Sequence, residues 1–218
     1  MFDRVQYKKN AKSQLKGQWG IPILITAISF GVSIILSAPA FLSKMLDIFQ
    51  TENTGNGVSI IVSGSADFLS VLNWLAIGIF SVAQIHVYLI MSASRIKITF
   101  NNFLDGLTLW IRAILSSLWY TLWVAIWLCL FIVPGLIKMI SYSMMFFLVA
   151  EYPKLSIRKA MRISKVLTKG YKADLFIMGL SFLGWEILAS LSCGIGMLWL
   201  VPYSLLSYTN AYRSLKQM

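Results

Sequence analysis

Six long apolar segments constrain this chain more than any other feature of its sequence. Most are as long as the roughly 20 helical residues that cross a bilayer core of about 30 Å. Only 12% of all residues are charged, against about 25% in soluble globular chains, and no polar stretch is long enough to fold alone. We therefore predict an all-α, polytopic transmembrane bundle in a single domain, residues 1–218. Its six spans cover approximately residues 21–40, 68–91, 113–133, 136–150, 173–193 and 195–212.

The fourth segment is unusually short. Its 15 residues, Leu136–Ala150, cover only about 22 Å at a helical rise of about 1.5 Å per residue. A short span, a re-entrant segment and a continuation of the third span through Pro134 all fit this length. The positions of the basic residues have to decide among them.

Lys and Arg fall almost entirely on one predicted side. With a cytoplasmic N-terminus and six spans, 17 of the 19 are cytoplasmic, and only Lys44 and Lys138 lie outside. A fourth segment that did not cross would move the seven cations of residues 154–172 outside, against the positive-inside rule. We therefore predict six spans, with both termini in the cytoplasm. Residues 43–67, rich in Gly, Asn, Ser and Thr, form the predicted flexible outer loop.

Ala38–Ala40 resembles a signal-peptide cleavage site. The apolar run before it is longer than the usual signal-peptide core, and five more apolar segments follow. We therefore expect a retained first span.

Two basic amphipathic helices are predicted at the cytoplasmic surface. In the first, residues 2–19, an apolar stripe runs beside a stripe of lysines. Such a helix can lie in the interface with its cations toward anionic headgroups, or it can be a charged flank that only orients the first span. Both interpretations fit. The apolar stripe consists of Tyr7, Ala11, Leu15 and Trp19.

The second amphipathic helix lies in the loop at residues 154–172, with Ser156 as its predicted N-cap and Gly170 as its C-terminal stop. Its cations are candidate contacts to anionic lipid, at about 1 kcal/mol per Lys or Arg near the headgroups. The alternative is a solvated connector. Nucleic acid is not an expected partner, because few aromatic residues interleave with the charges. The candidate lipid contacts are Arg158, Lys159, Arg162, Lys165 and Lys169.

Three polar side chains inside predicted spans are candidate intramembrane sites: Glu186, His86 and Gln84. Glu186 lies about 13 residues into the fifth span, roughly 20 Å from its cytoplasmic end at helical rise. An ionisable group at that depth is a functional candidate by default; the alternative is a neutral carboxyl hydrogen-bonded to a Ser or Tyr of a neighbouring helix. His86 lies nearer the cytoplasm, so a Glu186–His86 pair is not expected, and Gln84 is closer in depth.

Trp119, Trp123 and Trp127 recur at every fourth position of the third span. Such a row can line a cavity for a lipid tail or a cation, because indole faces attract cations. Packing or lipid-facing bulk is the plainer explanation.

Catalytic motifs are missing from the sequence. It contains no GxxxxGK[ST], HExxH or GxSxG pattern, and its two cysteines form no CxxC pair. We therefore expect no metal, no cofactor and no enzymatic activity.

Seven short blocks of sequence follow one another in a characteristic order. They are Leu15–Gly20, Pro134–Lys138, Ser141–Met144, Ala150–Pro153, Ser164–Gly170, Leu180–Trp185 and Gly194–Tyr203. In this order and spacing the chain resembles a bacterial family of membrane proteins, domain-of-unknown-function family 975. Glu186 departs from that pattern, where an apolar residue is expected. The resemblance implies a multi-pass protein of the bacterial plasma membrane and implies no activity.

Two functions stay open. The first is a non-catalytic membrane component that acts through membrane lipids, a partner membrane protein or a second copy of this chain. The second is a transporter or channel for ions or small solutes that uses Glu186. The sparse intramembrane charge favours the first, and an enzyme acting on lipids is the least supported class.

Overall fold

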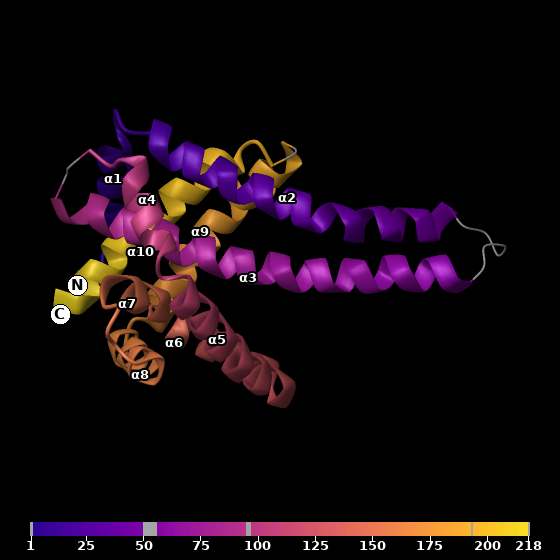
Figure 1. Ribbon diagram of the computed structural model, residues 1–218. Helices are drawn as coiled ribbons and strands as arrows, with labels where there is room; N and C mark the ends of the chain where they lie inside the picture. The colour runs from indigo at the N-terminus through magenta and orange to yellow at the C-terminus, as the bar shows by residue number, and fades with distance from the viewer. Residues whose placement is uncertain (1, 50–55, 95–96, 193, 218) are drawn as a thin grey trace.

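The computed structural model describes residues 2–49, 56–94, 97–192 and 194–217, and within them it contains ten α-helices and no strand (Figure 1). The helices are α1 Arg4–Leu15, α2 Gly20–Phe49, α3 Asn56–Ser94, α4 Phe100–Leu107, α5 Trp110–Leu130, α6 Ile132–Tyr142, α7 Met145–Glu151, α8 Ile157–Leu167, α9 Lys172–Leu191 and α10 Met197–Gln217.

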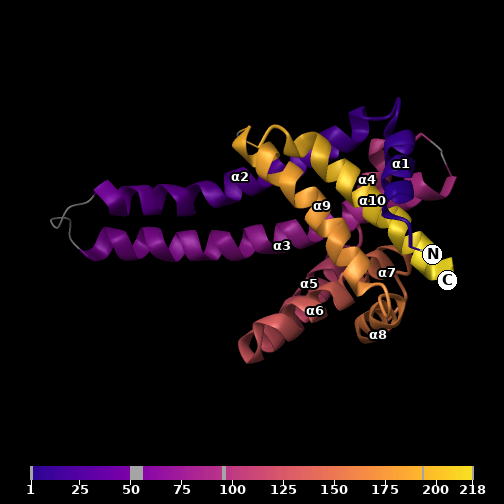
Figure 2. The same cartoon turned by 180° about the vertical axis from the view of Figure 1, so that it is seen from behind.

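The longest feature is the antiparallel hairpin of α2 and α3, which extends far beyond the other helices at one end of the molecule (Figures 1 and 2). Helix α2 continues through Pro39 to Phe49, and α3 begins at Asn56. The prediction of a loop over residues 43–67 is therefore wrong for the described part of that stretch, and residues 50–55 lie outside it. Short apolar runs such as Val58–Val62 allow the helices to continue where turn-forming residues suggested a loop.

Each of the other predicted spans corresponds to one helix, except the fourth, which corresponds to two. The third, fifth and sixth segments are α5, α9 and α10, whereas the fourth is broken into α6 and α7 at Ser143 and Met144. The short helix α4, between α3 and α5, was not predicted.

Within the described residues, five stretches are long and apolar enough to cross a membrane by length and composition. They are Gly20–Met45, Asp67–Ala93, Trp110–Leu130, Ile132–Glu151 and Lys172–Leu191. Helix α10 is not among them because its second half is polar, and Ser207, Thr209 and Asn210 are buried against its neighbours. The count of six spans therefore stays a prediction.

Helix α1 packs against protein. Tyr7, Ala11 and Leu15 are buried in apolar clusters with residues of α3, α9 and α10. The Tyr7 hydroxyl donates to Ser214 Oγ at 2.8 Å. The two termini lie together at the end of the molecule opposite the α2–α3 tip (Figures 1 and 2). The fold therefore buries this stripe against other helices, and the position of α1 at the membrane interface stays a prediction. Lys9, Lys12 and Lys16 stay exposed, so the helix keeps a cationic face.

Candidate functional site: a basic groove lined by tryptophan

The basic helix α8 forms where its sequence predicts. It runs over Ile157–Leu167, after Ser156 at the N-cap position with extended backbone, although the Ser156 side chain makes no capping hydrogen bond. Gly170 follows with a φ of +89°, a left-handed conformation that glycine adopts without a steric penalty. The predicted start and stop of this helix are confirmed.

Side-chain hydrogen bonds dock α8 onto the end of α6. The carbonyl groups of a last helical turn lack partners within the helix, and α6 ends at Tyr142. The Ser141 carbonyl accepts a hydrogen bond from Ser164 Oγ at 2.8 Å, and Thr168 Oγ1 lies 3.4 Å from the same oxygen. The Arg112 guanidinium of α5 donates to the Leu155 carbonyl just before α8. These contacts hold α8 across α5 and α6.

A groove of about 390 Å³ lies where α5, α6 and α8 meet. Its lining combines aromatic and apolar side chains with four cationic ones. The lining residues are Trp119, Trp123, Trp127, Lys138, Tyr142, Arg158, Met161, Arg162 and Lys165.

Cations lie directly over the indole rings of this groove. Lys138 Nζ is 4.4 Å from the centroid of the Trp127 ring, and the Arg158 guanidinium carbon is 5.5 Å from that of Trp119. Both distances are within the range of about 6 Å for cation–π attraction. The Trp123 indole N–H is shielded from solvent and has no hydrogen-bond acceptor among the described residues. The groove therefore combines positive charge with apolar surface.

The groove brings together two of the predicted candidate sets. The whole tryptophan row faces three of the candidate lipid contacts, Arg158, Arg162 and Lys165, while Lys159 and Lys169 are exposed and do not line it. The row lies along one side of α5, and only tertiary packing reveals which helix covers it.

Lys138 is the groove residue that sequence reasoning misplaced. We predicted it outside the membrane, opposite the basic loop, but it shares the groove with Lys165. The structure places Lys138 beside the basic helix α8, whereas the side of the membrane on which it lies stays a prediction. The signal available in the sequence was a single lysine that follows Pro134 and Gly135 in the first half of α6.

The three candidate intramembrane side chains do not form a common site. Gln84 Nε2 donates to Ser29 Oγ at 2.8 Å, and His86 Nδ1 lies 3.4 Å from the Ala150 carbonyl oxygen. Glu186 is exposed on α9, and no hydrogen bond or ion pair reaches it within the described ranges, although its charge acts on the Tyr208 hydroxyl of α10. The hypothesis of a carboxyl hydrogen-bonded to a neighbouring Ser or Tyr is therefore wrong for the described residues.

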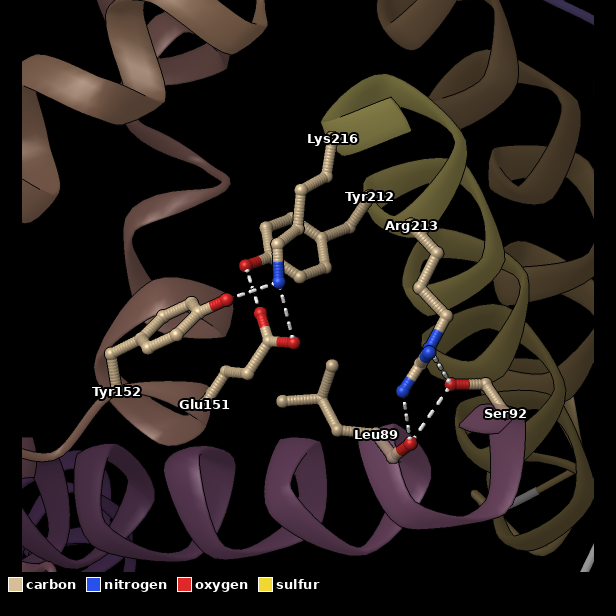
Figure 3. Close-up of polar contacts among 7 residues, drawn as sticks. All are labelled: Leu89, Ser92, Glu151, Tyr152, Tyr212, Arg213 and Lys216. Atoms are coloured by element: carbon tan, nitrogen blue, oxygen red, sulfur yellow. Dashed lines mark hydrogen bonds and ion pairs between the residues drawn. The ribbon is translucent and has the colours of Figure 1, made fainter. Parts of the chain in front are cut away.

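A second polar cluster ties α7 to α10 (Figure 3). Glu151 Oε2 accepts a hydrogen bond from the Tyr212 hydroxyl at 2.5 Å, and Oε1 forms an ion pair with Lys216 Nζ at 2.8 Å. Lys216 also donates to the Tyr152 hydroxyl. Tyr212 is completely buried and stacks on Phe147 at 5.3 Å. This cluster fixes the loop that leads into α8, and so it positions the groove indirectly.

Arg213 ties the same end of α10 to α3 (Figure 3). Its Nε donates to Ser92 Oγ at 2.5 Å and its Nη2 to the Leu89 carbonyl at 2.8 Å. The sequence alone suggested no contact for Arg213 or Glu151. The residues of α3 that bind Arg213 and the residues of α10 that bind Glu151 lie far away in the chain.

The chemistry of the groove suits the binding of an anion with an apolar part. No Asp or Glu lines it, so it offers no carboxylate for acid–base work. Within the described residues, no group of three His, Cys, Asp or Glu side chains is placed to hold a metal ion.

A family model described as a protein of unknown function, DUF975, matches residues 68–218. The blocks from Pro134 to Tyr203 lie within that stretch, whereas Leu15–Gly20 precedes it. No curated protein and no solved structure matches the chain. Because the family model covers more than two thirds of the sequence, the chain belongs to the DUF975 family.

Proposed function

We propose that this protein is a non-catalytic membrane component that binds the headgroup of an anionic lipid in the groove between α5, α6 and α8. The observation that carries the proposal is that four cations and three tryptophans line one cavity. An anionic lipid has a phosphate for the cations and an apolar glyceride region for the indole wall. The positive-inside distribution of Lys and Arg further supports a groove at the cytoplasmic face of a bacterial plasma membrane.

The groove cations supply both attraction and selectivity. Each Lys or Arg near an anionic headgroup contributes about 1 kcal/mol, so Arg158, Arg162 and Lys165 together account for about 3 kcal/mol. That free energy corresponds to roughly a 150-fold change in affinity. A zwitterionic headgroup has no net charge and gains much less.

A transporter that uses Glu186 receives less support. A site for a transported ion needs polar groups that converge, but Glu186 is exposed on α9, and Gln84 and His86 contact Ser29 and Ala150 instead of Glu186.

Native mass spectrometry of the full chain in a neutral detergent tests the proposal. Phosphatidylglycerol and phosphatidylcholine are titrated separately, and the bound fraction gives each affinity. The test variant replaces Arg158, Arg162 and Lys165 with Gln. The matched control replaces Lys154, Lys159 and Lys169, which are exposed cations of the same segment outside the groove.

We expect the wild-type chain to prefer phosphatidylglycerol, the groove variant to lose that preference, and the control variant to keep it. An equal loss in both variants would show that diffuse charge attracts the lipid without a groove. Equal binding of the two lipids by the wild-type chain would refute the proposal. Displacement of the lipid by millimolar inorganic phosphate would instead indicate a site for free phosphate.

A further inference from the structure

We propose that the hairpins α5–α6 and α9–α10 do not cross the membrane. Each enters from the cytoplasmic side and turns back within the bilayer core, so that α2 and α3 form the only complete crossings among the described helices.

The position of Lys138 limits the depth of α5–α6. Lys138 lines the same groove as Arg162 and Lys165 of α8, a helix whose cations belong at the cytoplasmic surface. The six residues from Ile132 to Lys138 along α6 correspond to about 9 Å. The tip of this hairpin therefore extends only about 9 Å beyond the level of Lys138, whereas the bilayer core is about 30 Å thick.

The tip of α5–α6 has the composition of a surface in contact with lipid. Leu130, Phe131, Ile132 and Val133 are 59–72% exposed, and no charged residue lies between Arg112 and Lys138. An aqueous outer loop would present these four neighbouring apolar side chains to water. Within the acyl chains the same side chains face an apolar solvent.

Helix α1 limits the depth of α9–α10 in the same way. Lys8 Nζ donates to Ser181 Oγ at 2.6 Å, and Lys12 lines a cavity together with Trp185. The six residues from Trp185 to Leu191, the last residue of α9, correspond to about 9 Å. This tip is apolar too, since Leu191 is 77% and Ile195 61% exposed.

The α2–α3 hairpin differs in how far it extends beyond the cationic helices, because α5 and α9 are also long and apolar enough to cross. Helix α2 begins just after α1 and contains 30 residues, which correspond to about 45 Å, more than a bilayer core needs. Figures 1 and 2 show its tip far beyond the turns of the other two hairpins. Only this pair reaches the opposite surface.

The re-entrant arrangement accounts for two charged side chains that six complete spans leave unexplained. Lys138 lies on the cytoplasmic side, so that 18 of the 19 Lys and Arg are cytoplasmic and only Lys44 is outside. Glu186 follows Trp185, which lies at the level of Lys12. Its exposed carboxyl then lies near the headgroups, where a charge costs less than at the bilayer centre.

Spin labels on single cysteines measure the depth of each tip. In a background with Cys129→Ser and Cys193→Ser, Phe131→Cys and Ile195→Cys report the two tips. Lys44→Cys on α2 and Val166→Cys on α8 are water-exposed references for the two surfaces. The full chain is reconstituted in nanodiscs, where both surfaces are open, and spin relaxation by oxygen and by a water-soluble nickel chelate is compared.

We expect oxygen to relax both tip labels. The nickel chelate should relax both reference labels but neither tip label. Nickel relaxation at a tip equal to that at the Lys44→Cys reference would overturn the proposal for that hairpin. Ile132→Cys replaces Phe131→Cys if that variant does not fold.

Two substitutions by lysine test independently whether the α5–α6 tip lies within the bilayer. Ile132, at the α5–α6 tip, and Val166, on α8, are both 72% exposed. Ile132→Lys should abolish membrane insertion of the folded chain, because it puts a charge among the acyl chains, while Val166→Lys should preserve it. Equal tolerance of both substitutions contradicts a tip within the bilayer.

Discussion

Removal of the Glu151 carboxylate should destabilise the protein mainly through Tyr212. The Tyr212 hydroxyl donates to Glu151 Oε2 at 2.5 Å and is completely buried. Glu151→Ala therefore leaves a buried donor without an acceptor, which costs about 1–3 kcal/mol. The ion pair with Lys216 is partly exposed and contributes only about 0–1 kcal/mol. We expect a total loss of about 1–4 kcal/mol in the free energy of unfolding.

A double-mutant cycle isolates the contribution of Tyr212. Tyr212→Phe removes the hydroxyl and keeps the ring that stacks on Phe147, so Glu151→Ala in that background should cost at least about 1 kcal/mol less than in the wild-type chain. The free energies come from reversible SDS titration in mixed micelles, followed by circular dichroism. A coupling energy below about 0.5 kcal/mol would refute the assignment of Tyr212 as the main partner of Glu151.

Three further perturbations test the packing and charge contacts. Gly106→Ala should cost about 1–3 kcal/mol in the same titration, because the added Cβ would lie 2.8 Å from the Cα of Ala83; Gly184→Ala, with open space around it on α9, should instead stabilise by about 0.5–1 kcal/mol. Arg213→Lys should cost about 0.5–1.5 kcal/mol, since an ammonium cannot reproduce both bonds of the guanidinium; an unchanged midpoint would contradict this. Burial opposes the charge of Lys216, but its hydrogen bonds to a carboxylate and a tyrosine raise its pKa above 10.5. Its stabilising contribution should therefore be complete below pH 10.5 and disappear at higher pH, a loss that Lys216→Met should abolish in melting curves recorded against pH.

Local patterns predicted the elements well. Apolar runs located α2, α3, α5, α9 and α10, because burial of apolar side chains and intrahelical hydrogen bonding favour the same stretches in a membrane. The bounds of α8 also followed from local chemistry at Ser156 and Gly170. The end of α2 could not be predicted. Turn-forming and apolar residues are mixed in this part of the chain, and the sequence alone does not show whether the preference for a turn or for a helix is stronger.

The candidate site was predicted in parts that the sequence could not join. The row of Trp119, Trp123 and Trp127 and the cations of α8 were each recognised, but their meeting depends on Ser164 and Thr168 docking on the Ser141 carbonyl. Those hydrogen bonds are tertiary and leave no periodic pattern. The exposure of Glu186 was likewise beyond sequence reasoning, because one apolar helix can turn either face to its neighbours.

The contact between the first and last helices determines when the fold can be completed. Tyr7 and Ser214, which hydrogen-bond to each other, are 207 positions apart. At about 5–20 residues per second, a ribosome needs roughly 10–40 s to synthesise the chain between them. Throughout that interval the apolar stripe of α1 has no α10 to cover it, so the nascent chain must protect that stripe in another way, and this contact can form only after Ser214 has been synthesised.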